Sequence, residues 1–324
     1  MYTSDELLEK VNNYLDTLAY GRTPESLYQP IQYVLGLGGK RIRPVLMLLS
    51  YNLYHENPDN ILSSACALET YHNYTLLHDD LMDEAPIRRG QPTVHTKWNA
   101  NQAILSGDSM LVLAYERLVH CDSKHLEAVL QLFTETALQI GEGQQYDMEF
   151  EKRDDVAVDE YIEMIRLKTS VLLACAMKMG AILADASADD ADNLYKFGEL
   201  IGLAFQLQDD YLDVYGDSKV FGKKIGGDIV SNKKTYMLIT AFNQANDKQR
   251  AELESWIGKT DFDAEEKITA VTKLYNEMGI GQLAKKKMDY YYEQSKKYLA
   301  AISLPEERKS ELKAYAAMMM KRQK

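Results

Sequence analysis

Two short acidic segments are candidates for binding a metal ion. Residues 79–83 and 209–213 both read Asp-Asp-x-x-Asp, and both lie inside apolar stretches, where aspartate is a poor helix former. On a helix, the first and third aspartates of each segment share a face, because positions i and i+4 lie about 40° apart. Carboxylates crowded in this way repel one another unless a cation bridges them. The expected metal ligands are Asp79, Asp80, Asp83, Asp209, Asp210 and Asp213.

Acid clusters of this type suit magnesium that is bound to a diphosphate. Magnesium prefers oxygen ligands and is usually held by one or two carboxylates together with substrate phosphates and water. Two such clusters facing each other would bind a magnesium-diphosphate between them. The alternative is that both are solvated surface charge. Asp154-Asp155 and Asp189-Asp190 fit that alternative, because they lack a third aspartate at this spacing and an apolar surround.

Positive charge gathers beside the acidic segments. Residues 38–44 read Gly-Gly-Lys-Arg-Ile-Arg-Pro, and Arg88-Arg89-Gly90 follows the first acidic segment. Gly222-Lys223-Lys224 and Lys233-Lys234-Thr235 follow the second. Glycine allows close backbone approach, and the planar fork of arginine suits bidentate phosphate contacts. A single loop cation is more often merely solvated, so it is the position beside the acids that makes these residues candidates for phosphate binding.

Long helices are expected to carry these segments. No proline occurs between Pro92 and Pro305, which suits uninterrupted helices. Apolar residues recur every three or four positions over residues 126–140 and 162–176, whereas sustained alternation and Asn-Gly hairpin turns are missing from the sequence. The sequence therefore predicts an all-α bundle of roughly ten or more helices. No linker rich in Pro, Gly or Ser divides the chain, so we predict a single domain over residues 1–324.

Composition and charge exclude several classes of protein. Apolar residues make up 46% and charged residues 27% of the 324 residues, which is the globular range. The net charge of −12 argues against nucleic acid, because binding its phosphate backbone needs a cationic surface. No apolar run approaches the ~18 residues of a membrane span, and the N-terminus lacks the apolar core of a signal peptide. Three distant cysteines, Cys66, Cys121 and Cys175, indicate reduced thiols and predict a cytoplasmic location.

With these motifs in this order, the chain resembles the trans-isoprenyl diphosphate synthases, also called the polyprenyl synthetase family. The match runs from the Gly-Gly-Lys-x-x-Arg-Pro segment through both acidic segments to Lys233-Lys234-Thr235. The resemblance implies an isoprenoid synthase-like fold, which is a helical bundle around a central cavity. It also implies a short-chain prenyltransferase that joins isopentenyl diphosphate to an allylic diphosphate (dimethylallyl, geranyl or farnesyl) and releases pyrophosphate. Ionisation, condensation and elimination would depend on Mg²⁺, with three ions per active site, and the protein would be a homodimer.

The same resemblance implies a role for each site residue. The six aspartates would bind the magnesium ions that hold the allylic diphosphate. Contacts to isopentenyl diphosphate are implied for Lys40, Arg43, His72 and Arg89. Contacts to the allylic diphosphate are implied for Arg88, Lys223 and Lys233, with Lys224 as the alternative to Lys223. The residues implied to lie beside the breaking carbon–oxygen bond are Lys168, Thr169 and Gln206. Gly143-Gln144 and Asp147 match the family's Gly-Gln-x-x-Asp element.

Product length is expected to depend on three residues that precede the first acidic segment. Tyr71, Tyr74 and Thr75 lie eight, five and four positions before Asp79. The two tyrosines share a helix face that could form the floor of the cavity, although ordinary core packing would also explain them. By the resemblance, an aromatic residue at the fifth position, a small one at the fourth and no insertion in the motif favour geranylgeranyl diphosphate (C20). Farnesyl diphosphate (C15) is close behind.

Two other functions remain open at this point. A class I terpene cyclase shares the first acidic segment and the helical fold, but it normally carries a different second metal motif. A non-catalytic helical subunit of a prenyltransferase tends to lose one acidic segment, whereas both are intact here. The sequence does not identify the preferred allylic primer or the final product.

Overall fold

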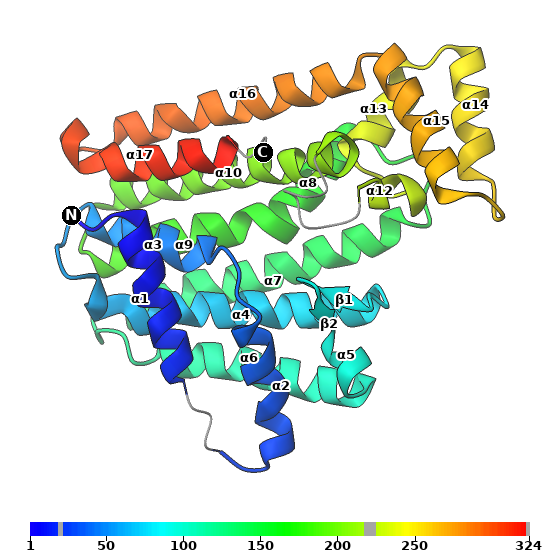
Figure 1. Cartoon of the computed structure of the whole chain (residues 1–324). Helices are drawn as coiled ribbons and strands as arrows, with labels where there is room; N and C mark the ends of the chain where they lie inside the picture. The colour runs from blue at the N-terminus through cyan, green and yellow to red at the C-terminus, as the bar shows by residue number, and fades with distance from the viewer. Residues whose placement is uncertain (19–21, 217–224, 322–324) are drawn as a thin grey trace. The chain divides into compact units, whose positions relative to one another are not determined.

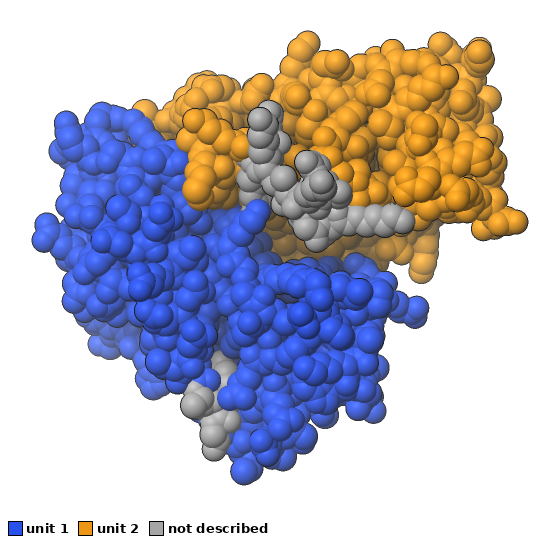
Figure 2. Space-filling view, viewed as in Figure 1, with its two compact units in different colours: residues 1–135, 172–195, 301–315 blue, residues 136–171, 196–300, 316–324 orange. Residues whose placement is uncertain are grey.

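The computed structural model describes residues 1–18, 22–216 and 225–321, and helices dominate it. The prediction of an all-α protein with ten or more helices is confirmed. Two compact units are distinguished in Figure 2. Unit 1 comprises residues 1–135, 172–195 and 301–315, and unit 2 comprises residues 136–171, 196–300 and 316–324. The single domain over residues 1–324 stays a prediction.

Unit 1 contains the first acidic segment and its neighbouring cations. Its elements are α1 (Ser4–Thr17), α2 (Glu25–Gly36), α3 (Ile42–Asn52), the 3₁₀ turn η1 (Pro58–Ile61), α4 (Leu62–Met82), α5 (Val94–Lys97), α6 (Ala100–Leu118) and nearly all of α9 (Val171–Leu183). Parts of α7 (Leu126–Phe150), α10 (Ala188–Tyr215) and α17 (Glu306–Met320) also belong to it. Side-chain caps start several of these helices, such as Asn99 on the Gln102 amide of α6.

The core of unit 1 is built around α4, which lies side by side with α6 (Figure 1). Residues 64–71 of α4 are all buried, so this helix is covered on every side over two turns. Close backbone approach supports the packing of its neighbours. A Cβ at Gly180 of α9 would collide with the Met47 carbonyl of α3, and the Ser50 hydroxyl donates a 2.6 Å hydrogen bond to the Met177 carbonyl.

A short β-hairpin follows α4. Strands β1 (Ile87–Arg88) and β2 (Gln91–Pro92) pair antiparallel. Arg89 and Gly90 connect them with φ values of +52° and +73°. Two left-handed residues in a two-residue loop favour a hairpin, because their twist matches that of the strands. The usual Asn-Gly signal is replaced by Arg-Gly, which is why the sequence pattern does not reveal this hairpin.

Unit 2 contains the second acidic segment. Its elements are α8 (Val158–Ile165), the π-helical turn η2 (Arg166–Ser170), α12 (Gly227–Val230), α13 (Tyr236–Gln244), α14 (Asp247–Ile257), α15 (Ala264–Glu277) and α16 (Ile280–Ala301), with the remaining parts of α7, α10 and α17. One apolar cluster joins α8, α10 and α13–α16, and Tyr161, Met237, Leu253 and Ile280 are among its most buried members. In the described part of the chain, no helix is both long enough and apolar enough to cross a membrane.

Candidate active site

Both acidic segments lie at the C-terminal ends of long apolar helices. Asp79 and Asp80 are in the last turn of α4 and Asp83 is its C-cap residue, while residues 209–213 lie in the last two turns of α10. The C-terminal end of a helix carries a partial negative charge, so added carboxylates are disfavoured there unless cations are nearby. The positions of both segments are therefore suited to binding cations and not to stabilising the helices.

In unit 1, Arg88 of the hairpin is the cation beside the first segment. Its Nε lies 2.8 and 2.7 Å from the two carboxylate oxygens of Asp80, and its Nη2 lies 3.6 Å from Asp79. Burial raises the pKa of Asp80 above its ordinary value, against the opposing hydrogen bonds from Arg88. A small pocket next to this pair is lined by Val34, Asn73 and Leu77, among other residues. The structure thus brings Arg88 to the aspartates.

The Gly-Gly-Lys-Arg-Ile-Arg-Pro segment has two kinds of cation. Lys40 is exposed and Arg43 is partly exposed, as a role in binding a ligand requires. Arg41 is different, because its Nη1 lies 2.7 Å from Glu69 and both side chains are at most 3% exposed. Its Nη2 also donates a 2.6 Å hydrogen bond to the Leu35 carbonyl. Arg41 therefore anchors the segment to α4, and the sequence alone did not separate it from its neighbours.

Arg89 is held by the two glycines of the same segment. Its guanidinium donates a hydrogen bond to the Gly38 carbonyl. Gly39 has φ of +137°, which favours glycine, and a Cβ there would lie 2.7 Å from Arg89 Nη2 and displace the guanidinium from this position. His72 of α4 is part of the same basic region. Burial, and then the positive charges of Arg43 and Arg89, hold its pKa well below the ordinary value, so the imidazole is neutral.

The residues expected to set product length belong to an aromatic cluster in unit 1. The Tyr71 ring lies 5.4 Å from that of Tyr74 and packs edge-on against Phe133 at 5.1 Å. The Tyr74 ring packs edge-on against His78 at 4.8 Å. A Cβ at Gly107 of α6 would lie 2.6 Å from His78 Cδ2, so this glycine lets the His78 ring lie against α6. Thr75 donates its hydroxyl to the His72 carbonyl at 2.8 Å.

In unit 2, the central aspartate of the second segment is buried in a hydrogen-bond network. Asp210 is 6% exposed and accepts hydrogen bonds from the Tyr161 hydroxyl and, at 3.1 Å, from Gln206 Nε2. Gln206 in turn accepts a 3.1 Å hydrogen bond from the Thr169 hydroxyl. Burial, followed by the negative charge of Asp228, raises the pKa of Asp210 to about 7. No spacing pattern in the sequence links Tyr161 to Asp210, because 49 residues separate them.

Lys168 and Thr169 lie on the π-helical turn η2, a feature often found at functional sites. Lys168 Nζ lies 2.6 Å from Asp147 Oδ2 of α7. Burial alone would raise the pKa of Asp147, but the charges of Lys233 and Lys168 hold it below its ordinary value. Two glycines allow other helices to pack closely against this turn. A Cβ at Gly143 would lie 2.8 Å from Lys168 Cα, and one at Gly202 would lie 2.6 Å from Ser170 Cα.

The chain from Gly226 onward is hydrogen-bonded to the second acidic segment. The amide of Gly226 donates to the Asp213 carbonyl at 2.6 Å, and the amide of Asp228 donates to Asp213 Oδ2 at 3.0 Å. Lys233 is exposed, and its amide donates to the Asp228 carbonyl at 2.9 Å. The structure therefore places Lys233 near the second segment. The predicted contact Lys223, and its alternative Lys224, lie outside the described residues.

The donor set fits a divalent metal that arrives with a diphosphate. Among the described residues, no three His, Cys, Asp or Glu side chains converge as ligands for a metal ion. Each segment instead presents hard carboxylate oxygens at a helix end with lysine or arginine beside them. Such a set suits a metal whose coordination is completed by substrate phosphates and water, which is the usual arrangement for magnesium.

Comparisons with known proteins agree with this geometry. The polyprenyl synthetase family model matches residues 24–278. A short chain isoprenyl diphosphate synthase of Methanothermobacter thermautotrophicus is 42% identical over 74% of each chain. A geranylgeranyl diphosphate synthase of Methanosarcina mazei is 41% identical over 72% of this chain and 73% of its own. A crystal structure of a geranylgeranyl pyrophosphate synthase superposes with a TM-score of 0.95 and 39% identity over the whole of both chains.

Proposed function

The chain belongs to the polyprenyl synthetase family and is a short-chain prenyltransferase, and from this premise we propose which reaction its residues support. The substrates are isopentenyl diphosphate and an allylic diphosphate, and the main product is geranylgeranyl diphosphate. The family uses a divalent metal. We propose that the ion is Mg²⁺, with three ions per site. The observation that supports this proposal most is that two Asp-Asp-x-x-Asp segments end apolar helices, each with a cation nearby.

The metal would be held by the carboxylates of Asp79, Asp80, Asp83, Asp209, Asp210 and Asp213. When bound, it supplies positive charge that stabilises the departing pyrophosphate. Arg88 and Lys233 add their own charge on the allylic diphosphate, and Lys223 is proposed to do the same. Lys40, Arg43, His72 and Arg89 bind isopentenyl diphosphate. The neutral His72 imidazole is suited to this task, because it donates a hydrogen bond without repelling the neighbouring arginines.

Lys168, Thr169 and Gln206 are proposed to line the place where the allylic carbon–oxygen bond breaks. Thr169 and Gln206 are hydrogen-bonded to each other, so the oxygen of Thr169 is held in one orientation. Lys168 is held by Asp147. Apolar side chains that exclude water protect the allylic cation until the double bond of isopentenyl diphosphate attacks it. The condensed cation then loses a proton to the departing pyrophosphate, which gives the new double bond.

The aromatic cluster below the first acidic segment supports a C20 product. The Tyr74 ring is fixed between Tyr71 and His78, and Tyr71 is fixed by Phe133. A ring held on two sides is a firm obstacle to a growing prenyl chain. Farnesyl diphosphate is the second candidate, because the same obstacle would give this shorter product if it stopped chain growth earlier. The cytoplasmic location stays a prediction.

The proposed homodimer is supported by an exposed apolar stripe on α6 and its C-cap residue Val119. Leu105, Val112 and Val119 are 57%, 67% and 45% exposed and follow one another at intervals of seven residues. Such a repeat keeps the side chains on one side of a helix, as in paired helices of coiled coils. A second copy of the chain could cover this stripe with its own α6. Analytical ultracentrifugation should give twice 36.9 kDa, and a monomer would contradict this assignment.

The test of the reaction is to incubate the protein with Mg²⁺, isopentenyl diphosphate and each allylic primer and to size the products by chromatography. We expect C20 products that disappear when a chelator removes the metal. The variant Asp80→Asn should lose about a hundredfold or more in kcat. The exposed Asp189→Asn serves as the matched control and should stay active. A wild-type protein that consumes no isopentenyl diphosphate would refute the proposed function.

A further inference from the structure

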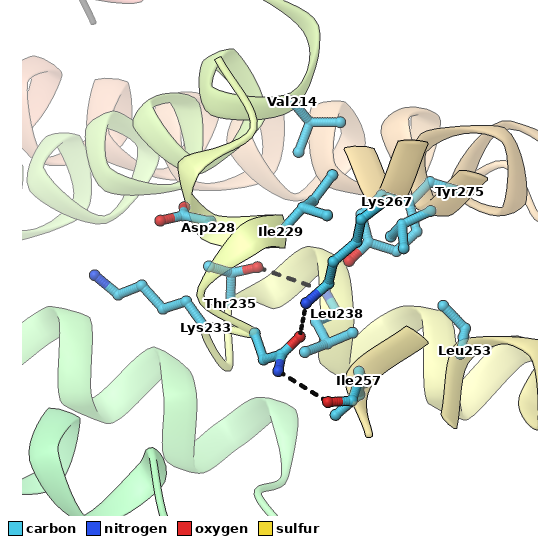
Figure 3. A pocket seen from close by; sticks show the side chains of 12 residues that line it. Val214, Asp228, Ile229, Lys233, Thr235, Leu238, Leu253, Ile257, Lys267 and Tyr275 are labelled. Carbon is cyan, nitrogen blue, oxygen red and sulfur yellow. Dashed lines mark hydrogen bonds between the residues drawn. The ribbon is translucent and has the colours of Figure 1, made fainter. Parts of the chain in front are cut away.

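A buried lysine lies next to the loop that carries Lys233. Lys267 of α15 is 1% exposed and lines a pocket together with Asp228, Asn232 and Lys233, which Figure 3 shows from close by. In the described part of the chain, no carboxylate pairs with its ammonium. Burying an ammonium without a carboxylate is costly, so a purely structural position in an apolar core would favour an apolar side chain.

Three groups satisfy the Lys267 ammonium. It donates hydrogen bonds to the Val230 carbonyl at 3.1 Å and to Asn232 Oδ1 at 2.6 Å. It also lies 4.3 Å from the centre of the Phe262 ring, within the range of a cation–π interaction. An ammonium has three donors, and here each direction has a partner. Burial lowers the pKa of Lys267 below its ordinary value.

The two hydrogen-bond acceptors belong to the chain between α12 and α13. Val230 is the last residue of α12, and Asn232 takes a left-handed φ of +56° two residues later. The Asn232 side chain also donates a 3.2 Å hydrogen bond to the Ile257 carbonyl at the end of α14. Lys267 and Asn232 therefore fasten this loop to α15 and α14. The neighbouring Ile268 packs against the start of α12, where a Cβ at Gly226 would lie 2.6 Å from its side chain.

Lys233 lies on the side of this loop that faces away from Lys267. In Figure 3 the side chains of Lys233 and Asp228 point away from Lys267 across the loop. The Lys233 amide is bonded to the Asp228 carbonyl, and the Asp228 amide to Asp213. A shift of the Val230–Asn232 backbone would therefore move Lys233 together with the contact to Asp213.

We infer that Lys267 is a positioning residue for the allylic diphosphate: its ammonium fixes the loop that aims Lys233 at the substrate. The inference rests on the proposed role of Lys233. It predicts a selective effect, because the proposed contacts of isopentenyl diphosphate, Lys40, Arg43, His72 and Arg89, all lie in unit 1. Loss of Lys267 should weaken binding of the allylic diphosphate and leave that of isopentenyl diphosphate unchanged.

The test compares steady-state kinetics of the full-length Lys267→Met and Asn232→Gly variants with wild type, in Mg²⁺, for geranyl diphosphate and isopentenyl diphosphate in turn. Methionine keeps the length of the lysine stem and removes the donors, and glycine keeps the left-handed backbone and removes the acceptor. Lys273→Met is the matched control, because this lysine is on the same helix and its side chain is 76% exposed. Its kinetics should match wild type.

We expect each of the two variants to raise KM for geranyl diphosphate about tenfold or more, as for the loss of a well-placed charged contact. KM for isopentenyl diphosphate should change less than twofold, and the double variant should be no worse than the more affected single variant. A merely structural role would instead lower the melting temperature and move both KM values together, or neither, and either result overturns the inference. If Lys267→Met does not fold, the two KM values of Asn232→Gly alone test the inference. An inactive wild type would refute the proposed function, which is a separate outcome.

Discussion

Replacing Gly143 with alanine should disable the active site without unfolding the protein. A Cβ at this position would lie 2.8 Å from Lys168 Cα and closer still to its amide nitrogen. Ordinary contact begins at 3.4 Å, so the backbone of η2 must retreat by more than 0.6 Å (3.4 − 2.8), because the amide nitrogen lies closer than Cα. Lys168 and Thr169 move with it. A misplacement of about 1 Å can cost about a hundredfold in rate, so we expect kcat to fall about tenfold to a hundredfold.

Stability should change far less than activity. Overpacking costs about 1–3 kcal/mol, but alanine in a helix gains about 1 kcal/mol over glycine, so the two effects partly cancel. Gly141→Ala is the matched control on the same helix, because Gly141 is exposed and a Cβ there would meet nothing within 4 Å. It should gain stability and keep full kcat. The assay combines single-turnover kinetics with urea denaturation, and equal kcat values for the two variants would refute the reasoning.

Three further changes test other parts of the structure. Tyr74→Ala should lengthen the products by removing an obstacle, which chromatography of the products would reveal, and an unchanged length would exclude Tyr74 from the floor. Glu69→Leu should lower the free energy of unfolding by about 3–5 kcal/mol, because it leaves the Arg41 guanidinium buried without its partner. A loss below about 1 kcal/mol in urea titrations would contradict a buried pair of that strength. The pKa of His72 is depressed by burial, so the unfolded chain binds its proton below about pH 6.5 while the folded protein does not. Stability should therefore fall as the pH drops below about 6.5, and His72→Gln should flatten this part of the melting temperature profile. Parallel profiles for the variant and wild type would disprove this origin.

The sequence predicted what depends on local pattern. The acidic segments were located on helices because both lie inside apolar stretches, and a spacing of four sets which aspartates share a face. The neighbouring arginines were identified by their position directly after the first acidic segment. Arg88 lies close to Asp80 because the hairpin follows shortly after the end of α4.

What the sequence could not predict depends on contacts between distant residues. Arg41 and Arg43 are two positions apart, yet only Arg41 is buried against Glu69, and no local signal separates them. The π-helical turn η2 packs closely against Gly143 and Gly202, which lie on two other helices. Tyr161 meets Asp210 through tertiary packing alone. Such contacts are fixed when the elements assemble, and the chemistry of the site depends on them.

The hairpin turn puts stability and activity in conflict at one position. Arg89 adopts a left-handed backbone with φ of +52°, a conformation that asparagine or glycine reaches more easily. Either replacement would relax the turn, yet it would remove the guanidinium held against Gly38 and Gly39. A library screened only for thermal tolerance should therefore discard Arg89, while one screened for turnover should keep it. With the proposed role of Arg89 in binding isopentenyl diphosphate, this position would lower the stability of the fold in return for function.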